Sequence, residues 1–93
     1  MSQGQKPFEA YLGKVVVLDC AAPFVYLGRL ERVEHDYLVL ADADVHDLRD
    51  SDSTRELYVR DSSIHGVRRN RKQVTVRMDA ILSVSLLEDV TDY

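Results

Sequence analysis

The fold of this chain is decided by residues 72–87, KQVTVRMDAILSVSLL. In the first half of this stretch, Val74, Val76 and Met78 alternate with polar residues, which is the period-two pattern of a half-buried strand. A second apolar run begins at residue 81, so two strands follow each other with almost no loop. Met78-Asp79 is poor chemistry for a two-residue hairpin turn, which favours Asn-Gly or Asp-Gly. The stretch therefore predicts a sharp bend between two strands, and small β-barrels close with such corners.

Length and composition predict a single domain over residues 1–93. Hydrophobic residues make up 45% and charged residues 30% of the chain, as in an ordinary globular protein with one modest core. Cys20 is the one cysteine, and we expect it to be a buried strand residue in a reducing, cytoplasmic setting. No apolar run approaches the roughly 18 residues of a membrane helix. The N-terminus lacks the apolar core of a signal peptide, so we predict no membrane association.

The charge pattern leaves two questions open. A net charge of −4 argues against strong non-specific binding to nucleic acid. The basic cluster Arg68, Arg69, Arg71 and Lys72 could make weak contacts to phosphates, or pair with acidic residues of a neighbouring subunit, which the net charge favours slightly. Acidic residues and one histidine crowd the preceding region, but they lack the glycine and terminal glutamate of a calcium loop. We therefore expect these residues to be solvated charges without a metal: Asp42, Asp44, His46, Asp47, Asp50 and Asp52.

Local signals predict the order helix, three strands, helix, two strands. The first helix is expected over residues 7–12, with Phe8, Tyr11 and Leu12 on one face. Three strands are expected over 14–20, 24–34 and 37–45; the first is apolar on both faces, and Gly28 marks a bulge or bend in the second. A loop over 46–52, a helix over 54–65 and strands over 73–79 and 80–88 complete the prediction.

The second predicted helix has clear boundary signals. Ser53 and Glu56 form a capping box, and Gly66 follows the helix as a left-handed C′ residue. The expected partly apolar face of this helix consists of Leu57, Tyr58, Asp61 and Ile64.

In these motifs the chain resembles the Sm-like (LSm-type) family. The first family motif matches Gly28-Arg29-Leu30, Val33-Glu34 and residues 38–43, LVLADA. The second matches residues 76–84, VRMDAILSV, and the entry into the first strand matches Leu12-Gly13-Lys14. The resemblance covers residues 8–88. It implies a mainly β fold, a small five-stranded, strongly bent antiparallel barrel of Sm-like (SH3-like) type with a short N-terminal helix. Residues 46–66, between the third and fourth strands, form an inserted loop and helix on this core.

The chain departs from the family pattern in both motifs. The turn of the first motif is one residue short, and Tyr37 stands where the family has asparagine. Met78 stands where the second motif has glycine. In the family, these two turns line the pore of a ring and hold an RNA base. Transferred by position, the resemblance implies an RNA-binding site formed by His35, Tyr37, Arg77 and Asp79.

Each of these residues also has a structural interpretation. Arg77 could contact a nucleotide, or it could pair with Asp36 or Asp79 and hold the two turns together. Tyr37 also fits a rim or core aromatic, and His35 a solvated turn residue. An aromatic ring stacks on an unpaired base with about 1–3 kcal/mol, so the binding interpretation is chemically sound.

Catalytic motifs are not found. The chain contains no nucleophile elbow, cysteine–histidine pairing, phosphate-binding glycine loop or zinc pattern, so we expect no enzyme, no cofactor and no catalytic residue. The resemblance implies a cyclic homo-oligomeric ring that binds single-stranded RNA. The alternative is an oligomeric scaffold that has lost RNA binding and holds a protein partner through the inserted helix.

Overall fold

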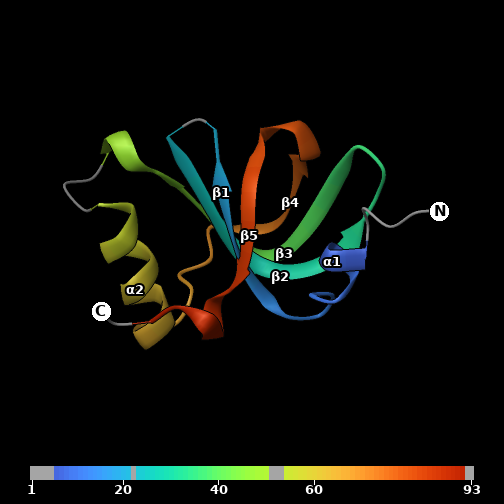
Figure 1. Ribbon diagram of the computed structural model, residues 1–93. Coiled ribbons are helices and arrows are strands. Elements are labelled where there is room, and N and C mark those ends of the chain that lie inside the picture. Colours follow the sequence, from blue (N-terminus) through green and yellow to red (C-terminus); the bar gives the residue numbers. More distant parts are fainter. Residues whose placement is uncertain (1–5, 22, 51–53, 92–93) are drawn as a thin grey trace.

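The computed structural model describes residues 6–21, 23–50 and 54–91. Five strands and two α-helices account for most of the described chain, and short 3₁₀ turns join them (Figure 1). In chain order the elements are α1 (Lys6–Glu9), β1 (Val15–Cys20), β2 (Phe24–Val33), β3 (Tyr37–Asp47), η2 (Leu48–Asp50), α2 (Arg55–His65), β4 (Arg71–Arg77), η3 (Met78–Ala80), β5 (Ile81–Leu86) and η4 (Leu87–Asp89).

The strands form one antiparallel sheet in the order β4-β3-β2-β1-β5. β4 and β5 follow each other in sequence but lie at opposite edges of this sheet, so the stretch between them is the predicted sharp bend and not a hairpin. The single 3₁₀ turn Met78–Ala80 makes this corner. The mainly β, strongly bent sheet with a helix between β3 and β4 confirms the predicted fold class.

Gly28 allows the sheet to bend. The β2–β3 register shifts between Leu27 and Arg29, where Asp42 on β3 has a φ of 50°. A Cβ atom on Gly28 would lie 3.1 Å from Cβ of Ala43, closer than ordinary van der Waals contact. The predicted bulge is therefore present, and it is a place where two backbones approach too closely for a side chain.

Apolar side chains fill both faces of the sheet. One cluster includes Val16, Leu18 and Cys20, which alternate along β1 and therefore share a face. The other cluster includes Val17 of β1 and Val59 of α2. The inserted helix thus covers the second face of the central strands, which explains why β1 is apolar on both faces. Cys20 is free and only 4% exposed, as expected.

The N-terminal helix is shorter than predicted. Regular helix ends at Glu9, and the amide of Tyr11 donates to the carbonyl of Phe8 (3.0 Å), a tighter turn than an α-helix makes. Phe8 and Tyr11 pack against the first core cluster, but Leu12 is 44% exposed and does not share their face.

The inserted segment differs from prediction at the end of β3, at the N-cap of α2 and in the buried face of α2. His46 and Asp47 belong to β3 and not to a loop, because they pair with Val25 and Phe24. The N-cap is Thr54, whose Oγ1 accepts from the amide of Leu57 (3.2 Å), so Glu56 is not at the position that a capping box requires. Ser53 lies outside the described residues, as do Asp52 and Ser51.

The buried face of α2 matches the prediction only in Tyr58, which packs against the second core cluster. Val59 and Ser62 are buried, whereas Leu57 and Ile64 are 49% and 60% exposed. An ion pair from Arg55 to Asp19 of β1 (2.9 Å) fixes the rotation of the helix at its first turn. Gly66 ends the helix with a φ of 91°, as its predicted C-terminal position requires. Within the described ranges, no helix is long and apolar enough to cross a membrane.

Candidate nucleic-acid interface

Two turns that are far apart in sequence meet around one hollow. The four predicted binding residues all line it, together with three others, and its volume is about 660 Å³. We call it the turn hollow; its lining residues are His35, Asp36, Tyr37, Thr75, Arg77, Met78 and Asp79. The structure thus brings the predicted site residues together.

Backbone hydrogen bonds hold the two turns in place. Tyr37 pairs with Arg77 where β3 and β4 lie side by side. Beyond this pair, the amide of Met78 donates to the carbonyl of Asp36 (2.8 Å). Met78 therefore replaces the family glycine without separating the turns.

The polar side chains of the hollow contact one another in two pairs. Nη2 of Arg77 lies 2.7 Å from Oδ2 of Asp79, so Asp79, rather than Asp36, is the ion-pair partner of this arginine. Nδ1 of His35 lies 2.6 Å from Oδ1 of Asp36. All four side chains are more than two-thirds exposed, and solvent screens such pairs strongly. A ligand can therefore replace either contact at little cost.

Tyr37 is half-buried, unlike its exposed neighbours in the first turn. Its side-chain hydrogen bond to Arg32 raises the pKa of that guanidinium. The ring is thus anchored by a partner on β2 and still lines the hollow, which is the arrangement that a stacking platform requires.

Sequence reasoning missed three residues of the hollow: Asp36, Thr75 and Met78 as a lining residue. The signal for Thr75 was its spacing, because residues two apart on a strand share a face and Arg77 was already a candidate. Asp36 lies between the candidates His35 and Tyr37, but its carboxylate was not considered as a group that could contact a base.

Three of the four residues of the predicted basic cluster lie together on a second surface. Arg69, Arg71 and Lys72 line a hollow of about 600 Å³ with Arg29. Arg69 and Arg29 both donate to Asp42 (2.9 Å each). The hydrogen bond from Arg29 and that from Arg69 hold the pKa of Asp42 below its usual value. Part of the basic cluster thus forms an ion pair with an acidic residue of the same chain. Arg68 lies elsewhere, beside α2.

Comparisons with solved structures decide the fold family. The Sm protein of Pyrococcus abyssii in complex with a uridine heptamer superposes with a TM-score of 0.62 and 21% identity, over 91% of this chain and 99% of that chain. A second neighbour, an Sm-like protein of Archaeoglobus fulgidus, has a TM-score of 0.61 and 14% identity, over 92% of this chain and 96% of that chain. The chain has the Sm-like fold.

A further similar structure is a chain of a protein complex. A chain of the NatC complex bound to Gag peptide and CoA superposes with a TM-score of 0.55 and 12% identity, over 85% of this chain and 89% of that chain. In sequence comparisons, no protein-family model and no curated protein matches.

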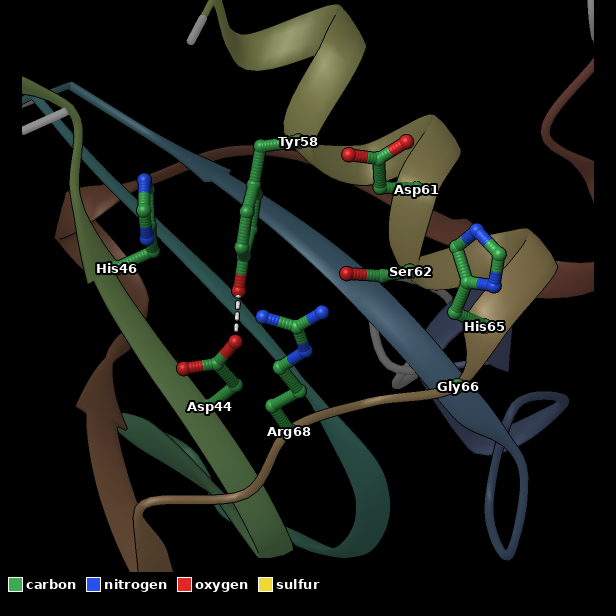
Figure 2. A pocket seen from close by; sticks show the side chains of 8 residues that line it. All are labelled: Asp44, His46, Tyr58, Asp61, Ser62, His65, Gly66 and Arg68. Atoms are coloured by element: carbon green, nitrogen blue, oxygen red, sulfur yellow. Dashed lines mark hydrogen bonds between the residues drawn. The ribbon is translucent and has the colours of Figure 1, made fainter. Parts of the chain in front are cut away.

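A polar cluster around the buried carboxylate of Asp44 holds the inserted helix on the Sm-like barrel, and Figure 2 shows Asp44 with Tyr58 and His46. The hydroxyl of Tyr58 donates to Asp44, which also accepts from Asn70 (3.1 Å). The Tyr58 ring stacks on His46 with 3.9 Å between ring centroids. Asp44 is only 7% exposed, so the prediction that it is a solvated charge was wrong.

The chemistry of this cluster is structural. Burial, reinforced by the hydrogen bond to Asp44, raises the pKa of Tyr58 well above its usual value, so Tyr58 stays a proton donor to the carboxylate. Among the residues that the structure describes, no group of histidine, cysteine and acidic side chains is arranged to hold a metal ion.

Proposed function

We propose that this Sm-like chain assembles into a closed cyclic homo-oligomer and binds single-stranded RNA at the turn hollow. One observation carries the proposal: residues from two distant turns, chosen from sequence alone, line a single hollow in the described structure. The fold is shared with an Sm protein that was solved with a uridine heptamer, which supports RNA as the ligand class. The assembling unit is a single domain over residues 1–93, with its core at 8–88 and an insertion at 46–66.

Edge-strand chemistry supports the ring. β4 and β5 are the two edges of the sheet, and each pairs on one side only within the chain. Leu82 of β5 is 72% exposed, and an open apolar edge invites pairing with another strand. Pairing β4 of one subunit with β5 of the next is a head-to-tail contact, which closes into a ring when the rotation per subunit permits.

The side chains of the turn hollow indicate which contacts would contribute most to RNA binding. His35 and Tyr37 offer rings for stacking, worth about 1–3 kcal/mol per base. Arg77 offers donors to a base or phosphate, but two carboxylates oppose the negative backbone. We therefore expect stacking to contribute more than phosphate contacts, and affinity to depend only weakly on salt. The lone buried Cys20 suits a reducing compartment, and we place the ring in the cytoplasm.

Two measurements test this function. Light scattering at micromolar concentration should give a mass of several subunits, and a monomer mass would refute the ring. Fluorescence anisotropy with oligo-U and oligo-A at low salt should detect binding that Arg77→Ala weakens about five-fold or more. Arg49→Ala is a matched control, because Arg49 also pairs with an aspartate two residues away (2.8 Å) and is also well exposed. Equal loss in both variants, or no binding by the wild type, would refute the RNA site.

One observation favours a second function, an oligomeric scaffold without RNA binding. Leu57 and Ile64 are exposed apolar residues seven positions apart on α2, so they share one face of the inserted helix. The NatC neighbour is a chain within a protein complex, which supports such a role. A Leu57→Ser/Ile64→Ser variant should lose a co-purifying protein that the wild type retains after RNase treatment. An unchanged set of partners would count against the scaffold.

A further inference from the structure

The turn hollow contains two carboxylates, one from the predicted site and one that the prediction left out. Asp36 and Asp79 line the hollow, with side chains 83% and 68% exposed. An ionised carboxylate accepts hydrogen bonds and donates none. A base read by such a group must present N–H donors toward it.

The four RNA bases differ in this respect. Guanine carries two adjacent donors, N1–H and the N2 amino group, on its Watson–Crick edge. Uracil carries one donor flanked by carbonyl oxygens, and adenine and cytosine each place an amino group beside an acceptor nitrogen. The two oxygens of a carboxylate match two adjacent donors, whereas any other base sets an acceptor against one of those oxygens.

Asp36 is the carboxylate placed to read a base. Its backbone is fixed, because its carbonyl accepts from the amide of Met78 (2.8 Å), and it directly precedes Tyr37, the half-buried aromatic of the hollow. Oδ1 of Asp36 contacts the exposed ring of His35 (2.6 Å). Asp79 is instead held by Arg77 (2.7 Å).

Arg77 completes the match to guanine. Arginine donors commonly contact O6 and N7 of guanine, and here Asp79 holds the guanidinium of Arg77, which lines the same hollow as Asp36 and Tyr37. The hollow therefore offers donors for O6, acceptors for N1–H and N2–H, and an aromatic ring for stacking.

We propose that the turn hollow prefers guanine, with Asp36 accepting from N1–H and the N2 amino group and Arg77 donating to O6. This inference rests on the proposed RNA-binding function and specifies its substrate. Asp36 is the specificity-determining residue, and Asp79 is a positioning residue that acts through Arg77.

Binding of labelled uridine heptamers with one central substitution tests the proposal on the assembled wild-type protein at about 50 mM salt. We expect the heptamer with central guanine to bind roughly 5- to 10-fold more tightly than those with central uracil, adenine or cytosine. This ratio is at the low end of the discrimination that a bidentate contact provides, because the site is exposed. Central inosine, which lacks the N2 amino group, should lose most of this advantage.

The matched pair Asp36→Asn and Asp79→Asn separates reading from positioning. An asparagine amide presents one donor and one acceptor, which suits uracil, adenine and cytosine but not the two adjacent donors of guanine, so Asp36→Asn should abolish the preference for guanine. Asp79→Asn should weaken all heptamers alike and keep guanine preferred. Equal binding of the four heptamers, or a guanine preference that survives Asp36→Asn, would overturn the inference and leave the proposed function standing. Failure of every heptamer to bind would overturn both.

Discussion

Replacing Tyr58 with phenylalanine removes one hydroxyl from the polar cluster that holds α2 on the barrel. The hydroxyl donates to Asp44, which is 7% exposed and keeps the 3.1 Å hydrogen bond from Asn70 in the variant. The ring itself, stacked on His46, keeps its apolar contacts. The change therefore removes the hydrogen bond to a buried carboxylate, together with the hydroxyl's hydrogen bond with Ser62, and leaves the ring in place.

The expected cost follows from the desolvation of that carboxylate. Leaving a buried charged acceptor short of one donor costs about 1–3 kcal/mol of unfolding free energy. For a domain of this size, each kcal/mol lowers Tm by roughly 4–8 °C. We expect Tyr58→Phe to lower Tm by at least about 4 °C in thermal denaturation followed by circular dichroism. Wild type and variant must be compared at one protomer concentration, because assembly contributes to apparent stability.

Tyr37→Phe is the matched control for this experiment. Tyr37 is also half-buried, but its partner Arg32 has a 53% exposed side chain that water can solvate when the hydroxyl is lost. Its effect should stay within about 0.5 kcal/mol. If Tyr58→Phe were as mild as Tyr37→Phe, the cluster would not hold the helix, and the account of the inserted segment would be wrong.

The remaining predictions concern the bend, an ion pair and the thiol. Gly28→Ala should cost about 1–3 kcal/mol in urea denaturation, because its Cβ would lie 3.1 Å from Ala43; an unchanged midpoint would mean that the bulge relaxes freely. The hydrogen bonds from Arg49 lower the pKa of Asp47 from 3.8 to about 2, so the stability that this pair contributes is complete above pH 3.8 and is lost as pH falls toward 2. Wild type and Arg49→Ala should therefore converge in stability over that window, and a constant difference would contradict the pairing. Burial raises the pKa of the Cys20 thiol, so alkylation of the native protein should be far slower than in urea, and rapid native labelling would refute its burial.

The strands and the corner were predictable because their signals are local. Alternation at Val74 and Val76, and apolar residues on both faces near Val16 and Val17, depend only on burial, which the sequence pattern reports directly. The turn hollow was predictable through the family resemblance, whose motifs selected Tyr37 and Arg77, and the paired strands β3 and β4 carry these two residues to neighbouring positions.

The inserted helix was placed correctly, but its face was not, because contacts with distant residues decide it. Arg55 pairs with Asp19, 36 positions earlier, and Tyr58 pairs with Asp44 across the loop. Neither pairing can be predicted from helical periodicity. Asp44, the partner of Tyr58, is buried, although we expected it to be a solvated charge. In this segment, specific polar pairs outweigh the weak apolar pattern of Leu57 and Ile64.

Photo-crosslinking tests the central claim most directly. The assembled protein, bound to a heptamer containing 4-thiouridine, is irradiated, digested and analysed by mass spectrometry for modified peptides. The account predicts adducts on the residues of the turn hollow, with His35 and Tyr37 foremost, because stacked aromatic rings lie closest to the base. Adducts confined to the basic surface around Arg69 and Arg71, or to α2, would contradict it.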